Sequence, residues 1–363
     1  MVERIRLLGL LLSATAVLPV VAAPPEKEEW PKPTHTLKGW VGGLAFSPDS
    51  KTLVACGVDP DQPPPAGRFQ VPDTSIAVWD VTTGKPVGAF KGQKETRTVA
   101  FSPDGALIAS AGKGGLHLWD VKTGKVVRSV DAHSGQVRTI AFSPDGKFLA
   151  SDAAIGGDVT VGLWETGTLK RATLAPDYKG NVNTLAFSPD GKALAFGGFG
   201  GDSVHVWGVD TGKERLVIEP GRYTVPCAAF APDGKTLAVG IRLSFPKDGP
   251  PRAFPAPPPS QRVVTLYDSA TGKSVGNLTA SGGPIHSVAY SPDGKLLATA
   301  NGNERVELFD VATQKVLASL KMEPWPDEVA FSPDGKVLAA GSRGGFGGRG
   351  EKCVKLWNLE RDK

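Results

Sequence analysis

The stretch Ala141-Phe142-Ser143-Pro144-Asp145-Gly146 is the most informative part of this 363-residue chain, because closely similar copies of it occur seven times. The aromatic residues of the seven copies are Phe46, Phe101, Phe142, Phe187, Phe230, Tyr290 and Phe331. Successive copies lie 41 to 60 residues apart. Such a period is typical of stacked supersecondary units, which bury their apolar faces only against one another. The sequence therefore predicts one repeat array rather than two independent domains.

Each copy is a predicted tight turn between two short strands. In the third copy, residues 137–142 favour a strand that ends at the turn. Pro144 presets φ for the second turn position, and Gly146 accepts the positive φ that closes a hairpin. The expected remaining strands of this repeat cover residues 148–151, 159–164 and 169–174. Four short antiparallel strands, repeated seven times, predict an all-β fold, a seven-bladed β-propeller.

A second motif closes the third strand of each repeat. Its copies are Trp79-Asp80, Trp119-Asp120, Trp164-Glu165, Trp207-Gly208, Tyr267-Asp268, Phe309-Asp310 and Trp357-Asn358. Several continue into a Thr-Gly-Lys turn, as Thr123-Gly124-Lys125 does. The two motifs together resemble the WD-repeat (WD40) family over roughly residues 34–360. The resemblance implies a non-catalytic scaffold that binds protein partners.

The family also has a buried hydrogen-bond network in each blade, built around a His that follows a Gly. His133 matches that position, whereas Trp40, Gln93 and other residues occupy it in the remaining repeats. We therefore expect most of this network to be missing and the blades to depend more on packing.

The ends of the repeats do not coincide with the ends of the blades. The seventh repeat ends after its third strand, at Trp357-Asn358. Residues 34–38 precede the first repeat at the place of a fourth strand, and they are expected to complete the seventh blade, as in the family. Pairing the two ends of the chain removes the exposed edges of an open array. We expect a propeller over residues 34–363 and an exposed linker over residues 23–33.

The first 22 residues differ in character from the repeats. Arg4 and Arg6 precede an apolar stretch, residues 7–21, which is followed by the small residues Ala22 and Ala23. This order is typical of a secretion signal cleaved after Ala22. The sequence thus predicts a signal peptide over residues 1–22 and an exported, bacterial-type protein, periplasmic or secreted. The alternatives are an uncleaved anchor, although the stretch is short for a span of about 20 residues, and neither kind of segment.

The composition and the motifs of the chain give little indication of chemistry. The net charge is +4 and no basic run occurs, so we expect no nucleic-acid partner. The five His residues form no metal-ligand spacing and no nucleophile motif is present, so we expect no catalytic residue, no metal and no cofactor. The three Cys residues are expected to be buried thiols, with a Cys56–Cys353 bridge as the alternative. We expect a monomer that does not bind membranes once the signal is removed.

The loops are elaborated unequally. The three long insertions, at about 57–74, 241–262 and 342–352, all follow a second strand, so in a propeller they share one face with the loops that join blades. Loops of this kind carry function more often than the scaffold does. The first-strand position four residues before each motif aromatic adds polar side chains to the same face. From both sets, the predicted partner-binding residues are Trp40, Arg97, Arg138, Asn183, Tyr178, Tyr223, His286, Trp325 and Asp327.

Aromatic residues and Arg are the residue types that dominate binding hot spots. The sequence therefore predicts protein or peptide partners on this face, without identifying them. The alternative is an exported propeller that binds or hydrolyses a small molecule or a glycan at the mouth of its channel.

Overall fold

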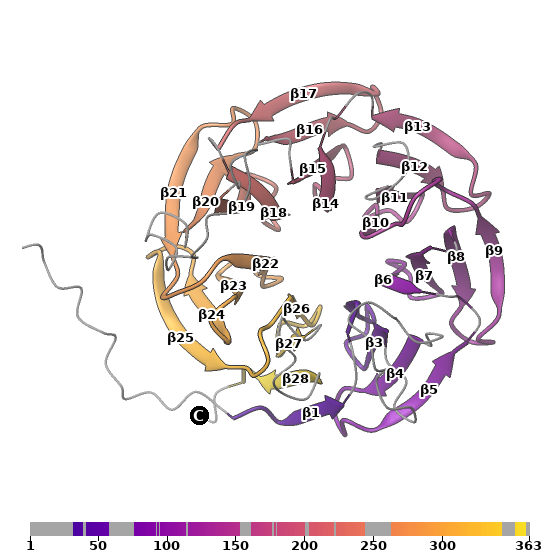
Figure 1. Ribbon diagram of the computed structural model, residues 1–363, viewed down its shortest axis with the longest axis horizontal. Coiled ribbons are helices and arrows are strands. Elements are labelled where there is room, and N and C mark those ends of the chain that lie inside the picture. The colour runs from indigo at the N-terminus through magenta and orange to yellow at the C-terminus, as the bar shows by residue number, and fades with distance from the viewer. Residues whose placement is uncertain are drawn as a thin grey trace, which may run out of the picture.

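The structure is a computed structural model that describes residues 32–38, 41–57, 76–91, 93, 95–113, 115–152, 161–175, 178, 180–199, 203–220, 223–243, 263–342 and 353–360. These ranges hold 28 strands in seven four-stranded antiparallel sheets, arranged as blades around a central hole (Figure 1). The predicted all-β, seven-bladed propeller is confirmed. Across the same ranges, no helix is long and apolar enough to span a membrane.

In the first six blades, four consecutive strands form one sheet in sequence order. Blades one to three comprise β2 (Gly43–Phe46), β3 (Thr52–Cys56), β4 (Ile76–Asp80), β5 (Pro86–Phe90); β6 (Thr96–Phe101), β7 (Leu107–Gly112), β8 (Gly115–Asp120), β9 (Val126–Val130); and β10 (Ile140–Phe142), β11 (Phe148–Asp152), β12 (Val161–Glu165), β13 (Arg171–Ala175). Blades four to six comprise β14 (Asn181–Phe187), β15 (Ala193–Phe199), β16 (Val204–Gly208), β17 (Lys213–Ile218); β18 (Tyr223–Phe230), β19 (Thr236–Leu243), β20 (Val263–Asp268), β21 (Ser274–Thr279); and β22 (Ile285–Tyr290), β23 (Leu296–Asn301), β24 (Arg305–Asp310), β25 (Lys315–Lys321).

The seventh blade joins the two ends of the chain. It comprises β26 (Glu328–Phe331), β27 (Val337–Gly341), β28 (Cys353–Asn358) and β1 (His35–Lys38). His35 pairs with Leu356 and Leu37 with Val354, and the amide of Thr34 donates to the carbonyl oxygen of Leu356 at 2.7 Å. The predicted closure of the ring by the amino-terminal strand is confirmed.

The Ser-Pro-Asp-Gly turns have the geometry that their sequence predicts. In the third blade, the Ser143 hydroxyl donates to Asp145 Oδ1 at 2.7 Å and accepts from the amide of Phe148 at 2.9 Å. Gly146 has φ of 71°, a conformation that glycine adopts without a steric penalty. The hydrogen bond from Ser143, followed by that from the Lys147 amide, holds the pKa of Asp145 below its usual range. The repeated Asp residues are therefore turn-forming groups.

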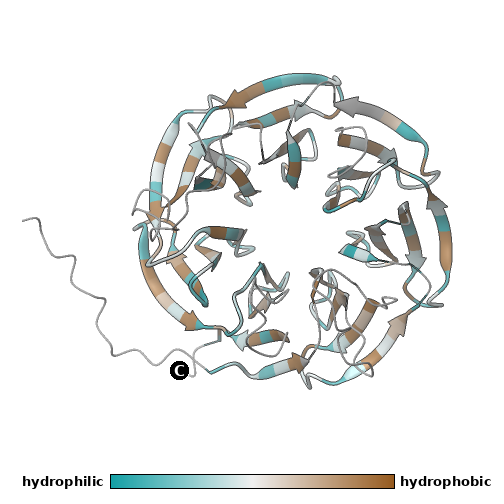
Figure 2. Cartoon of the chain, viewed as in Figure 1, coloured by the Kyte–Doolittle hydropathy of each residue, from teal (hydrophilic) through white to brown (hydrophobic). Residues whose placement is uncertain are grey.

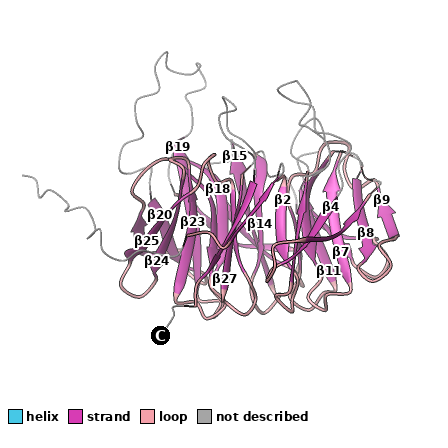
Figure 3. Cartoon of the chain, turned by 90° about the horizontal axis from the view of Figure 1, so that it is seen from below, coloured by secondary structure: helices cyan, strands magenta, loops and turns pink. Residues whose placement is uncertain are grey.

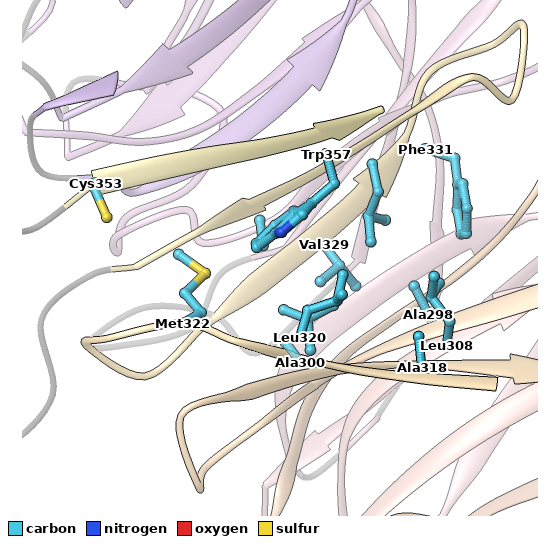
Figure 4. Packing of buried hydrophobic residues seen from close by; sticks show 13 residues of the cluster. Ala298, Ala300, Leu308, Ala318, Leu320, Met322, Val329, Phe331, Cys353 and Trp357 are labelled. Carbon is cyan, nitrogen blue, oxygen red and sulfur yellow. The ribbon is translucent and has the colours of Figure 1, made fainter. Parts of the chain in front are cut away.

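Neighbouring blades are held together by apolar packing between their sheets. In Figure 4, Trp357 and Val329 of blade seven lie against Leu320 and Ala300 of blade six. The Trp357 side chain is only 1% exposed, so the aromatic residue of the second motif fills the space between blades. Burial of this kind contributes roughly 1.5–3 kcal/mol for each large apolar side chain. Figure 3 shows the strands running between the two faces of the resulting ring.

Candidate functional site: the mouth of the central channel

The first strands of all seven blades line one cavity at the centre of the ring, with a volume of about 830 Å³. Figure 2 shows hydrophilic residues on several of these inner strands beside the hole. The position four residues before each motif aromatic faces the cavity in every blade. The seven residues at this position, called the rim here, are Gly42, Arg97, Arg138, Asn183, Pro226, His286 and Asp327. Residues 41 to 285 positions apart in the chain thus meet around one opening.

A recurring β-bulge sets the rim apart from the regular ladder. In blade two, Thr96 pairs with Gly112 and Thr98 with Ala111, so Arg97 is the extra residue between them. Asn183 and His286 occupy the same place in blades four and six. A bulge inserts an unpaired residue, bends the strand and re-aims the side chain. The bulges therefore direct the side chains of Arg97, Asn183 and His286 toward the channel.

Blade three fixes its rim residue by a different device. Its first strand begins at Ile140 rather than at the expected Val137, because the Asp152 carboxylate takes the place of a ladder partner. Asp152 Oδ1 accepts from the amides of Arg138 at 2.9 Å and Thr139 at 2.8 Å. The Arg138 side chain then donates to Asn183 Oδ1 of blade four at 3.1 Å.

Asp152 itself is fully buried, and this burial raises its pKa to about 7, against the lowering effect of the two amide hydrogen bonds. Its second carboxylate oxygen has no hydrogen-bond partner within the described ranges. Sequence reasoning missed this residue because Asp152 belongs to no repeated motif. Its position as the one charged residue of the second strand, after Leu149-Ala150-Ser151, was the available signal.

Arg242 is a second residue of the cavity that the sequence analysis missed. It lies near the end of β19, a strand of eight residues in which Arg242 pairs with Thr224. The Thr224 hydroxyl donates to the Arg242 carbonyl oxygen at 3.2 Å. Partial burial lowers the pKa of the Arg242 guanidinium. The expected insertion at 241–262 hid this residue, because β19 continues to Leu243.

The predicted partner-binding residues do not all reach the mouth. Arg97, Arg138, Asn183, His286 and Asp327 line the cavity, and Trp325 is 39% exposed on the connection between β25 and β26. Trp40 lies outside the described residues, and only the backbone of Tyr223 is described, within β18.

Tyr178 was expected on the surface, and the structure places it in the interior, where it is 6% exposed. Its ring packs edge-on against Phe196, with centroids 5.7 Å apart, and against His205, with centroids 5.1 Å apart. This apolar and aromatic packing makes the Tyr178 ring inaccessible to a protein that binds at the channel mouth.

A buried hydrogen-bond network is present in two blades, including the blade in which His133 matches the family position. In blade three, the Ser151 hydroxyl accepts from Trp164 Nε1 at 2.8 Å and is hydrogen-bonded to His133 Nε2 at 2.8 Å. In blade two, Gln93 replaces the His. Ser110 donates to Gln93 Oε1 and accepts from Trp119 Nε1 at 2.7 Å, and Gln93 is itself buried.

One hydroxyl–imidazole–carboxylate arrangement lies away from the cavity, in blade four. His205 Nε2 is 3.0 Å from Ser203 Oγ, and His205 Nδ1 is hydrogen-bonded to Glu214. The His205 ring is stacked on Phe196 with centroids 5.5 Å apart, and Ser203 is 8% exposed. A nucleophile must reach its substrate, so this packed arrangement is a structural network of the blade.

The cysteines provide no reactive group at the channel. All three are buried and none forms a disulfide, so the Cys56–Cys353 bridge is not formed. Cys227 lines the cavity, but burial raises the pKa of its thiol to about 12, which leaves it protonated and weakly nucleophilic. Among the residues that the structure describes, no group of three metal-ligating side chains could hold a metal ion.

Seven four-stranded blades, each closed by an aromatic residue at its third strand and joined through the amino-terminal strand, define a repeat-built β-propeller. The family described as WD domain, G-beta repeat matches residues 31–80, 84–120, 124–164, 171–208 and 328–358. These segments cover more than half of the chain, which belongs to this family. The family described as anaphase-promoting complex subunit 4 WD40 domain matches residues 260–326.

Several curated proteins are similar over part of the chain. Small ribosomal subunit protein RACK1y of Oryza sativa subsp. japonica is 36% identical over 102 residues, which are 27% of this chain and 26% of that protein. Cross-pathway control WD-repeat protein 2 of Flammulina velutipes is 33% identical over 97 residues, 26% of each chain. Centriole proteome protein 16 of Chlamydomonas reinhardtii is 34% identical over 98 residues, 26% of this chain and 4% of that protein. The similar segment thus spans about a quarter of two relatives and far less of the third.

Proposed function

We propose that this protein is a non-catalytic scaffold that binds protein or peptide partners at the mouth of its central channel, on the face that carries the loops between second and third strands. The observation that carries this proposal is the rim. Equivalent positions of seven similar repeats line one cavity, yet they hold different side chains, including two Arg, an Asn, a His and an Asp. A merely structural position would favour one residue type throughout, as the Ser-Pro-Asp-Gly turns on the opposite face do.

Site-specific cross-linking tests this proposal. A photoreactive amino acid placed at Asn183 or Trp325 should form covalent adducts with partner proteins in an extract of the source cells. The same amino acid at Lys147 or Lys192, which follow turns on the opposite face and are exposed, should form none. Adducts from the lysine positions alone would contradict the proposal.

The alternative is a small molecule or glycan bound in the cavity. Its volume of about 830 Å³ supports this candidate, because ligand sites commonly measure about 300–1,000 Å³. Native mass spectrometry of the purified chain distinguishes the two functions. A co-purifying small molecule that is lost on Arg138→Ala favours the alternative, and its absence together with rim-dependent protein adducts favours the scaffold.

We also propose that the protein is exported, on the basis of Arg4, Arg6 and the apolar stretch that ends at Ala22. These residues lie outside the described ranges, and the relatives named above come from eukaryotes. Amino-terminal sequencing of the native protein tests the proposal. A mature chain that begins near Ala23 supports it, and an intact Met1 or Val2 in a cytosolic pool contradicts it.

A further inference from the structure

The charges around the cavity are distributed unevenly. Three arginine residues line it, namely Arg97 in blade two, Arg138 in blade three and Arg242 in blade five. The acidic residues of the described lining are Asp327 and Glu328, and both belong to blade seven. The sector formed by blades two to five therefore lines the cavity with positive charge and hydrogen-bond donors, whereas both acidic residues of the lining lie in blade seven. The Asp152 carboxylate of blade three is buried beneath Arg138 and is not part of the lining.

The backbone beneath two of these arginines is fixed. A Cβ placed on Gly42 of blade one would lie 2.9 Å from the Arg97 carbonyl oxygen, so the neighbouring strand packs closely against Arg97. Asp152 holds the amide of Arg138, and Asn183 accepts from the Arg138 side chain. A group held in place before binding loses less entropy when a ligand arrives.

The third arginine is only partly solvated. Burial lowers the pKa of Arg242, which means that its charged form is less stable there than in water. An anionic ligand compensates for such lost solvation by charge-assisted hydrogen bonds. The planar guanidinium is well suited to carboxylates, which it contacts through two parallel hydrogen bonds.

We propose that the sector of Arg97, Arg138 and Arg242 binds an acidic peptide segment whose Asp or Glu side chains enter the channel mouth. This inference rests on the proposed function and names the chemistry of the partner. The three arginines come from three blades, and blade four separates two of them from the third. A chain with several carboxylates can meet separate guanidinium groups. A long polyanion would also meet Asp327 and Glu328, which disfavours nucleic acid.

Fluorescence anisotropy with the full chain tests this inference. The probes are labelled peptide pools of about twelve residues that contain Asp and Glu at several positions, and matched pools with Asn and Gln at the same positions. At about 0.15 M salt, the acidic pool should bind about tenfold more tightly or better, and binding should weaken as salt is added. Equal affinity for the acidic and amide pools would overturn the inference.

Single variants locate the site. Arg97→Gln, Arg138→Gln and Arg242→Gln should each weaken binding of the acidic pool several-fold, whereas Lys147→Gln and Lys192→Gln on the opposite face should not. Asp327→Asn should strengthen it, because a like charge is removed from the mouth. Loss of binding in the lysine variants with retention in the arginine variants would place the acidic segment elsewhere. Thermal unfolding of each variant, measured in parallel, shows that the fold is intact.

Two further measurements distinguish a phosphorylated ligand from an acidic one, and failure of this inference from failure of the proposed function. A pool with one phosphoserine and no Asp or Glu should bind more weakly than the acidic pool, and inorganic phosphate should compete poorly. Tighter binding of the phosphoserine pool would overturn the assignment to carboxylates. One outcome is that cross-linking at Asn183 captures partners that the variants Arg97→Gln, Arg138→Gln and Arg242→Gln still capture unchanged. In that case the proposal of an acidic peptide ligand is wrong, and the proposed scaffold function still stands. If the natural chain captures nothing at the rim, the proposed function itself fails.

Discussion

The hydroxyl of Ser50 in blade one accepts a hydrogen bond of 3.0 Å from the backbone amide of Asp334 in blade seven, across the point where the ring closes. Ser50 stands where later repeats have glycine, and it has a positive φ of 63°. Gly105, its counterpart in blade two, instead lies near the Pro48 ring, 3.5 Å from where a Cβ would be. The one repeat that lacks this glycine thus links the first and last turns of the ring.

Ser50→Ala should lower the free energy of unfolding by about 1 kcal/mol, because the hydrogen bond is lost and the positive φ remains. Ser50→Gly loses the same bond but relieves the backbone, so it should be more stable than Ser50→Ala by about 1 kcal/mol. Urea unfolding followed by tryptophan fluorescence measures both. An alanine variant as stable as the natural chain would show that the contact does not contribute.

The amino-terminal strand should contribute much of the stability of blade seven. Leu37 is 4% exposed and belongs to the core between blades one and seven, while its neighbour Thr36 is exposed. Leu37→Asp should destabilise the protein by roughly 3 kcal/mol or more, because it leaves a cavity and buries a charge. Thr36→Asp, one position away on the opposite side of the strand, should have little effect. Similar melting temperatures for the two variants would contradict ring closure through β1.

The hydrogen-bond network of blade three should contribute more to the free energy of unfolding than a surface hydroxyl does. Ser151→Ala removes the group that joins Trp164 and His133 and leaves the buried indole N–H without this acceptor. The expected loss is about 1–3 kcal/mol. Ser129→Ala on the exposed face of β9 is the matched control and should change stability little. Thermal unfolding of both variants measures the two losses of stability. Equal losses would show that the hydrogen bonds of Ser151 do not contribute to stability.

Asp152 should make stability depend on pH in a particular direction. Its pKa in the folded protein is about 7, above the ordinary value of 3.8, so the folded state binds the proton more tightly than the unfolded state. The stability that this group contributes is fully present below about pH 4 and is lost as the pH rises toward 7. Asp152→Asn cannot lose a proton from this site. Its stability relative to the natural chain should therefore increase by about 1–4 kcal/mol between pH 4 and pH 8.

Urea unfolding of both proteins across this pH range is the measurement. The acidic groups of the surface turns titrate equally in both chains, so the comparison isolates Asp152. A difference in stability that stays constant with pH would show that Asp152 is ionised in the folded protein well below pH 7.

The repeated motifs were sufficient to predict the blades and the rim, because each follows from a spacing that recurs seven times. The closing strand followed from the seventh repeat, which ends after its third strand and leaves residues 34–38 as the missing fourth strand. Asp152 and Arg242 could not be predicted in this way, since each is unique to its blade and acts through contacts between strands. Tyr178 shows that a residue expected on the surface can instead be buried. A Tyr in a loop between blades is expected to be exposed, but the Tyr178 ring fills the space beside Phe196 and His205. Gln93 similarly replaces the family His by forming the same hydrogen bond to Ser110.

The most direct test of the account compares partner capture by two triple variants of the full chain. Arg97, Arg138 and Trp325 change to Ala in one variant, and Lys147, Lys192 and Lys295 change to Ala in the other, on the opposite face. Hot-spot side chains contribute about 2 kcal/mol or more each, so the first variant should lose captured partners by orders of magnitude. The second should capture them as the natural chain does, and both should melt at similar temperatures. Loss of capture in the lysine variant, with full capture in the rim variant, would contradict the assignment of the binding face.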